Sequence, residues 1–167
     1  MRRLGRWARQ GALLLLLLAM VTGVMDMLRR PQLPAVLPAQ LTDLAGRPLA
    51  LTALSAERPL LIYVWASWCG VCRVTSPTVD ALARHGENVV TLALRSGDDA
   101  RLSQLLTQRG WRFPVINDAD GRLSAAWRVG VTPTFIILSR GQVVGSTTGW
   151  SSYPGLWLRL RWAQWFA

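Results

Sequence analysis

The 167-residue chain contains no lysine, one histidine and only two cysteines. The disulfide frameworks of small secreted domains use more cysteines, spread further apart, so the sequence excludes a fold of that kind. One histidine and two cysteines also fall short of the four ligands that a closed zinc site needs. We therefore expect no structural zinc.

All 19 basic residues are arginine and only nine residues are acidic, which gives a net charge of +10. Charge of this sign can indicate nucleic-acid binding. Six of the arginines, however, lie within residues 1–30, and the others are scattered along the chain. We therefore expect a mildly basic, solvated surface and no nucleic-acid partner.

The longest apolar run lies near the N-terminus. Residues 1–10 carry four arginines, and residues 11–25 are then free of charge. Fifteen uncharged residues span only about 22 Å as a helix, which suits a signal peptide as well as an anchor. No good small-x-small cleavage site follows, so we favour an uncleaved transmembrane anchor within residues 1–30. The arginines before the run place the N-terminus in the cytoplasm and the rest of the chain outside it.

The remaining residues are typical of one α/β domain. Residues 31–40 contain three prolines and predict a semi-rigid linker, and the domain would then span residues 41–167. An unbroken apolar run at 60–65 suits a strand that is buried on both faces, and residues 88–94 predict a second buried strand, joined to the first by a helix in a right-handed crossover. We expect the next helix to be capped by the Asp98-Asp99 pair, to run to 108–109 and to be stopped by Gly110. After it we expect a short strand at 113–116, a helical stretch at 123–127, a hairpin of 134–138 with 142–146, and a final helix at 153–166.

Cys69 and Cys72 follow the first of these strands, at the point where a helix is expected to begin. Cys-x-x-Cys in this position is typical of a thiol–disulfide redox site. The first turn of a helix has unpaired backbone N–H groups and the positive end of the dipole, and both favour a thiolate over a thiol. The spacing lets the second sulfur close a small ring with the first. We predict that Cys69 attacks and that Cys72 resolves.

The segment from Trp65 to Cys72, WASWCGVC, resembles the active-site signature of the thioredoxin superfamily. Pro77 lies where these proteins often kink the active-site helix, and residues 131–135, VTPTF, resemble the loop whose proline is cis and faces the disulfide. The resemblance covers roughly residues 41 to 150. It implies an α/β thioredoxin fold, with a central mixed β-sheet flanked by helices.

The resemblance also implies five residues that support the cysteines or bind substrate. Trp68 would flank the site, whereas Trp65 would belong to the core. Gly70 and Val71 would separate the cysteines and tune the redox potential. The backbone of Thr132, before the cis Pro133, would offer strand-like hydrogen bonds to a substrate peptide, and the same loop would keep a metal from the thiols.

Residues 41–51 resemble the extra N-terminal hairpin of the membrane-anchored, TlpA-like branch of this superfamily. A narrower resemblance, to the D proteins of the bacterial suppressor-of-copper-sensitivity system, rests on residues 95–99, 148–150 and 158–162.

Two positions depart from the family pattern. Tyr63 stands where thioredoxins have a buried acid, and Thr75 stands where many TlpA-like reductases have a glutamate. We expect Asp80, further along the helix, to be solvated. Without an acid that accepts the proton of Cys72, the resolving step should be slow or pH-dependent.

The sequence therefore predicts a single-pass protein of the inner (cytoplasmic) membrane whose periplasmic domain reduces the disulfide of a partner protein through Cys69 and Cys72. No cofactor is implied beyond this redox-active disulfide, and the electrons would come from a membrane electron-donor protein. The narrower resemblance implies a role in copper tolerance, with cytochrome c maturation as the alternative. Two readings of another class stay open: copper(I) binding or delivery by the two thiolates, and a redox-inactive docking module.

Overall fold

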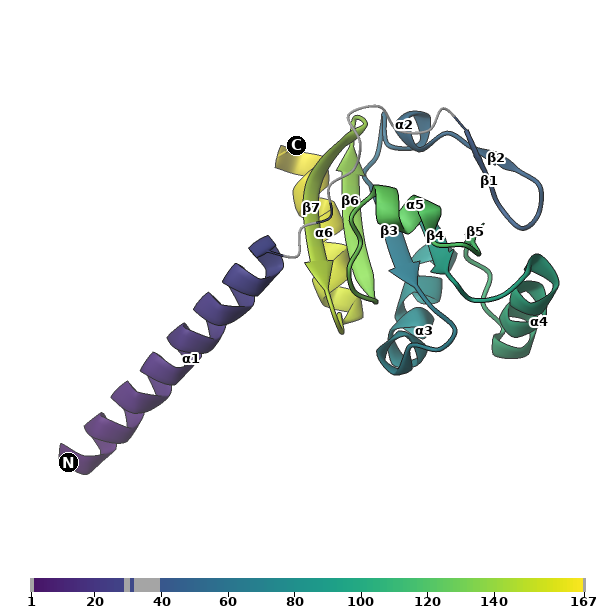
Figure 1. Cartoon of the computed structure of the whole chain (residues 1–167). Coiled ribbons are helices and arrows are strands. Elements are labelled where there is room, and N and C mark those ends of the chain that lie inside the picture. The colour runs from purple at the N-terminus through teal and green to yellow at the C-terminus, as the bar shows by residue number, and fades with distance from the viewer. Residues whose placement is uncertain (1, 29–30, 32–39, 167) are drawn as a thin grey trace. The chain divides into compact units, whose positions relative to one another are not determined.

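The computed structural model describes residues 2–28, 31 and 40–166 (Figure 1). The chain divides into two compact units, Met1–Arg30 and Pro31–Ala167. Most of the linker predicted over 31–40 lies outside the described residues.

The first unit holds one helix, α1 (Arg2–Leu28), which is 27 residues long. It begins within the basic leader, so arginines share the helix with the leucine run. In the described part of the chain, no helix combines the length and the apolar character that crossing a membrane requires. The predicted transmembrane anchor is therefore not confirmed.

The second unit is built on a five-stranded mixed sheet with the order β5-β4-β3-β6-β7. Strands β3, β4 and β5 are parallel, β6 is antiparallel to β3, and β7 is antiparallel to β6. The strands are β3 (Leu60–Trp65), β4 (Val89–Leu94), β5 (Val115–Asp118), β6 (Thr134–Ser139) and β7 (Gln142–Thr148). This sheet confirms the predicted central mixed sheet.

Helices cover both faces of the sheet because the side chains of β3 alternate between two apolar clusters. Leu61, Tyr63 and Trp65 pack with the helices α3, α4 and α6, and the even-numbered residues of β3 pack with Leu51 and Trp127 on the other face. The helices are α2 (Leu51–Leu54), α3 (Gly70–Arg84), α4 (Asp99–Arg109), α5 (Arg122–Ala126) and α6 (Tyr153–Phe166).

A small hairpin precedes the main sheet, as the resemblance implies. Strand β1 (Leu41–Thr42) pairs antiparallel with β2 (Pro48–Leu49). The carboxylate of Asp43 closes the turn between them by accepting hydrogen bonds from the backbone N–H groups of Ala45 and Arg47 and from the Arg47 guanidinium.

The fold brings three chain segments to one edge of the sheet. The parallel strands β3 and β4 both end there, and in parallel sheets this edge is where sites commonly form. Strand β6 runs in the opposite direction, so it begins at the same edge. The loops that carry the cysteines, residues 95–98 and residues 131–133 therefore meet.

Candidate active site

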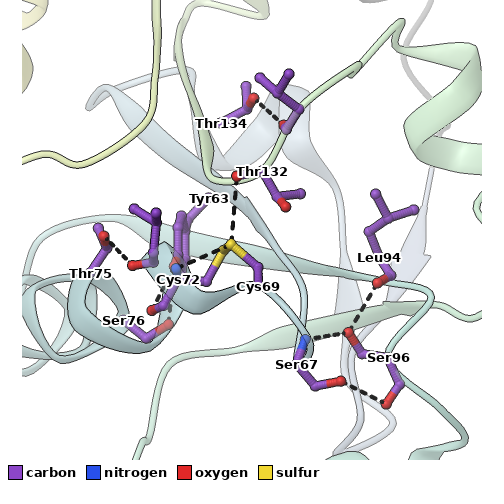
Figure 2. The surroundings of a disulfide bond; sticks show 12 residues. Tyr63, Ser67, Cys69, Cys72, Thr75, Ser76, Leu94, Ser96, Thr132 and Thr134 are labelled. Carbon is purple, nitrogen blue, oxygen red and sulfur yellow. Dashed lines mark hydrogen bonds between the residues drawn. A yellow bond between two sulfur atoms is a disulfide. The ribbon is translucent and has the colours of Figure 1, made fainter.

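Cys69 and Cys72 form a disulfide at the start of α3, as Figure 2 shows. Cys69 is the residue that caps the helix, and the backbone N–H of Cys72 donates a hydrogen bond to its Sγ over 3.2 Å. When the pair is reduced, this N–H and the helix N-terminus both stabilise negative charge on Cys69. The predicted strand–turn–helix setting of the cysteines is confirmed.

The two sulfur-bearing residues differ in exposure. Cys69 is 7% exposed and Cys72 only 1%. Around Cys69 lie exposed side chains of Trp68 and Val71, with the exposed Gly70 between the cysteines. A partner molecule therefore reaches Cys69 more readily than Cys72.

The second loop at the site holds Pro133, whose peptide bond with Thr132 is cis. The carbonyl oxygen of Thr132 lies 3.5 Å from the Cys69 Sγ (Figure 2). A disulfide sulfur carries no hydrogen, so this is a close contact in the oxidised form, and it can become a hydrogen bond from the thiol in the reduced form. The Thr134 hydroxyl donates to the Val131 carbonyl over 2.7 Å and closes the loop. The cis bond inferred from the family resemblance is confirmed.

Trp68 and Trp65 lie in the separate places that the sequence predicts. Trp65 is buried in the core, with its indole N–H donating to the Thr91 hydroxyl. Trp68 is 60% exposed, and its indole N–H donates to the Arg95 carbonyl over 3.1 Å. It therefore stands beside the disulfide, tied to the loop after β4.

A second hydrogen bond joins the same two loops. The backbone N–H of Ser67 donates to the Ser96 hydroxyl over 2.8 Å, and that hydroxyl donates to the Leu94 carbonyl over 3.0 Å (Figure 2). Ser96 is buried, so the link is shielded from water. The loop that carries Trp68 and Cys69 is thereby held on the end of β4.

The hydroxyl groups of Tyr63 and Ser76 form a buried pair beneath Cys72, which the sequence did not predict. The Tyr63 hydroxyl is 3.0 Å from the Ser76 hydroxyl and 3.4 Å from the Cys72 carbonyl oxygen. Burial raises the pKa of Tyr63 far above its usual value, so the phenol stays neutral. The spacing of four residues places Ser76 on the same face of α3 as Cys72, whereas its contact with Tyr63 depends on the fold.

Two other buried polar residues of α3, Thr75 and Asp80, do not serve the cysteines. The Thr75 hydroxyl donates to the Val71 carbonyl of its own helix over 2.8 Å. The expectation that Asp80 is solvated is wrong: it is buried, pairs with Arg84 at 2.6 Å and accepts from the Arg112 backbone N–H. Within the described residues, no carboxylate hydrogen-bonds to either cysteine.

Metal ligands are not gathered at this site. In the part of the chain that the structure describes, no three His, Cys, Asp or Glu side chains lie close enough together to hold a metal ion.

A disulfide at a helix N-terminus, facing a cis-proline on a five-stranded mixed sheet, defines a thioredoxin-like protein. The family model of AhpC/TSA matches residues 34–146, and the chain belongs to that family. It is 39% identical over 159 residues to a "Thioredoxin-like protein" of Haemophilus influenzae, which covers 95% of each chain. It is 30% identical over 112 residues to "Thiol-disulfide oxidoreductase ResA" of Bacillus anthracis, covering 65% of this chain and 64% of that one.

Solved structures show the same fold. StoA from Bacillus subtilis matches with a TM-score of 0.64 at 18% identity, over 74% of this chain and 96% of its own. A secreted disulfide oxidoreductase of Mycobacterium tuberculosis matches with a TM-score of 0.59 at 24% identity, over 73% of this chain and 93% of its own. Identities this low show the fold alone.

The family, the curated relatives and the disulfide together settle the class of enzyme. The chain is a protein thiol–disulfide oxidoreductase of the thioredoxin family, and Cys69 and Cys72 form its Cys-x-x-Cys pair. The narrower resemblances, to the TlpA-like branch and to the copper-sensitivity D proteins, are not confirmed by these comparisons.

Proposed function

We propose that the enzyme reduces the disulfide of a partner protein outside the cytoplasm, with Cys69 as the attacking residue and Cys72 as the resolving residue. The observation that carries these roles is the asymmetry of the pair. Cys69 is the more exposed of the two cysteines, and only its sulfur receives a backbone N–H at the helix N-terminus. A thiolate in this place is stabilised and accessible.

The reaction proceeds in two exchanges. The Cys69 thiolate attacks one sulfur of the partner disulfide, that S–S bond breaks, and the second partner sulfur leaves as a thiolate and takes up a proton. Cys72 then loses its proton and attacks the Cys69 sulfur in the mixed disulfide. The remaining partner sulfur leaves and is protonated, so the partner gains two electrons and two protons and the enzyme is left with its disulfide.

The loop of Thr132 and Pro133 positions the partner. The Thr132 carbonyl is within 3.5 Å of the Cys69 sulfur, so an extended peptide that binds this backbone would bring its own disulfide to Cys69. Trp68 and Val71 offer apolar surface on either side of the cysteine. Main-chain recognition of this kind gives modest sequence preference.

Loss of the Cys72 proton limits the second exchange in this mechanism. Tyr63 and Ser76 lie under Cys72 but are neutral, and the pKa of Tyr63 is raised by burial, so neither is a base near neutral pH. Water must then accept the proton. The release of the partner should accelerate with rising pH.

Attachment to the inner membrane and exchange with a membrane electron donor belong to the proposal. Their support is the basic leader followed by the leucine run, together with relatives that are described as secreted. A role in copper tolerance rests on the narrower resemblance of residues 95–99, 148–150 and 158–162. Fusion of a reporter that is active only in the periplasm, followed by extraction of membranes with carbonate, tests the location.

The direction of electron flow is tested by the equilibrium reduction potential of Cys69 and Cys72 in defined thiol–disulfide buffers. A potential near or below about −250 mV supports a reductant, whereas about −120 to −180 mV belongs to oxidants and isomerases and would reverse the direction. If no disulfide forms again after reduction, tight binding of copper(I) by the two thiolates becomes the better explanation.

A further inference from the structure

A groove of about 770 Å³ lies next to the redox site, on the side of the loop that follows β4. Its walls come from the loop before Cys69, from the first turn of α3, from residues 95–97 and from one face of α4. Four of the lining residues are arginines: Arg73, Arg95, Arg101 and Arg109. We call this the arginine groove.

The charges of the arginine groove are not neutralised within the described residues. None of its four arginines forms an ion pair there, although four other arginines of the chain do. The two acids at the start of α4 form no ion pair with these guanidinium groups: Asp98 accepts from the backbone N–H of Arg101, and Asp99 accepts from the Asn117 amide. The groove therefore presents unpaired positive charge to solvent.

The arginine groove adjoins the disulfide. Trp68, the residue before Cys69, is part of its wall, and Arg73 directly follows Cys72. A cavity of about 20 Å³ reaches Cys72 itself and shares four lining residues with the groove: Ser67, Arg73, Leu105 and Arg109. A molecule in the groove is thus in contact with the surroundings of both cysteines.

The shape of the arginine groove suits a short length of extended polypeptide. Arg101, Leu105 and Arg109 lie four residues apart on one face of α4, which spans about 12 Å at 1.5 Å per residue. An extended chain covers this distance in about four residues. The two glutamines of the same face, Gln104 and Gln108, can hydrogen-bond to its backbone.

We propose that the arginine groove binds an acidic segment of the partner polypeptide, a few residues from the partner's own disulfide. This inference rests on the proposed function and adds the class of substrate. Carboxylates complement guanidinium groups in charge and geometry, and opposite charge at a binding surface chiefly accelerates association. The Thr132 backbone binds the segment around the partner disulfide, and the groove selects the acidic flank.

The experiment uses the reduced full chain and three peptides that share one internal disulfide and differ in a flank of four aspartates, four serines or four arginines. The second-order rate of peptide reduction is measured by acid quench and mass spectrometry at about 20 mM and about 300 mM salt. Each rate is divided by the rate at which dithiothreitol reduces the same peptide. This removes the effect that the flank has on the reactivity of the peptide disulfide itself. Salt screens exposed charges, so the change in rate between the two salt concentrations reports the electrostatic contribution to peptide binding.

We expect the aspartate peptide to react about tenfold faster than the serine peptide at low salt, and the arginine peptide to react more slowly than either. High salt should bring the three rates together. The variant R101Q/R109Q should lower the aspartate-to-serine ratio to about one. As a control, R140Q removes an arginine side chain just after the end of β6 that lies away from the disulfide, and it should leave the ratio unchanged.

Equal normalised rates for the three peptides would overturn the arginine groove as a binding site and leave the proposed function standing. A ratio that R101Q/R109Q preserves would also overturn it. If the reduced wild-type chain reduces none of the peptides, the proposed function itself fails. Glutamine favours helix as well as arginine does, and unchanged circular dichroism of the variants would show that the fold is kept.

Discussion

Replacing Tyr63 with phenylalanine removes a single buried hydroxyl and nothing of the ring packing. That hydroxyl is bonded to Ser76 at 3.0 Å, and the ring stacks on Phe135. A buried neutral hydrogen bond contributes about 1 kcal/mol net. At pH 7, Tyr63→Phe should therefore lower the free energy of unfolding by about that amount.

At alkaline pH the difference in stability should reverse, so that the phenylalanine variant becomes the more stable protein. Burial raises the pKa of Tyr63 in the folded protein, whereas the unfolded chain titrates near about 10. Above that pH the unfolded state has lost a proton that the folded state keeps, so stability is complete below about pH 10 and falls as the pH rises. The loss is about 1.4 kcal/mol for each pH unit above 10, until the folded pKa is reached. The phenylalanine variant has no phenol at this position and does not undergo this loss of stability.

The chain is well suited to the measurement because it has no lysine, and its cysteines are joined in a disulfide. Besides Tyr63, Tyr153 is the other tyrosine, and it is present in both proteins. Urea unfolding of oxidised wild type and Y63F at intervals between pH 7 and 11 should show the wild type more stable at pH 7 and the two curves crossing near about pH 11. If both proteins lose equal stability between pH 9.5 and 11, Tyr63 is not the buried neutral phenol described here.

Three further predictions concern the cysteines and two buried acids. Cys72→Ser should trap a mixed disulfide with a partner, seen as a shifted band on a non-reducing gel, and Cys69→Ser should trap none; trapping by Cys69→Ser instead would reverse the roles. Burial disfavours the charge of Asp43, but the hydrogen bonds and charge of Arg47 outweigh it, so the pKa of Asp43 is lowered. Asp43→Asn should therefore cost about 2 kcal/mol at pH 7 in urea unfolding, and the difference should begin to shrink below about pH 4, where the unfolded chain takes up a proton that the folded protein does not yet bind. A difference that does not shrink as the pH falls below about 4 would contradict this. Asp80→Ala should cost about 2 to 3 kcal/mol, since it leaves the Arg112 backbone N–H without its partner, and a cost below about 0.5 kcal/mol, the range of ordinary surface changes, would contradict it.

The parts of the fold that depend on local pattern could be predicted from the sequence. Six apolar residues in a row predicted β3, and all six are buried because helices cover both faces of the sheet. The Asp98-Asp99 pair was predicted to cap α4 and Gly110 to end it; the Asp98 carboxylate accepts from the Arg101 N–H, and Gly110 adopts a left-handed conformation. These features depend on neighbours within a few residues.

The features that were missed depend on residues far apart in the chain. Asp80 is buried because the Arg112 N–H, 32 residues away, is presented to it. Ser76 lies 13 residues from Tyr63, and nothing local indicates that their hydroxyls meet. The arginine groove likewise joins the start of α3, the loop after β4 and one face of α4, so scattered arginines in the sequence become neighbours only in the fold.

Cys69 is the N-cap residue of α3, and this position links the redox state of the enzyme to its folding stability. Reduction breaks the S–S bond and leaves the Cys69 sulfur at the helix N-terminus, where the fold favours negative charge on it. A thermodynamic cycle therefore relates the unfolding free energies of the two redox forms to the reduction potential of the pair. The oxidised and reduced proteins must differ in unfolding free energy by the amount that separates the potential of this pair from that of an unstructured Cys-x-x-Cys peptide, at about 30 mV for each 1.4 kcal/mol. Denaturation of the two forms would then yield the potential with no redox buffer present.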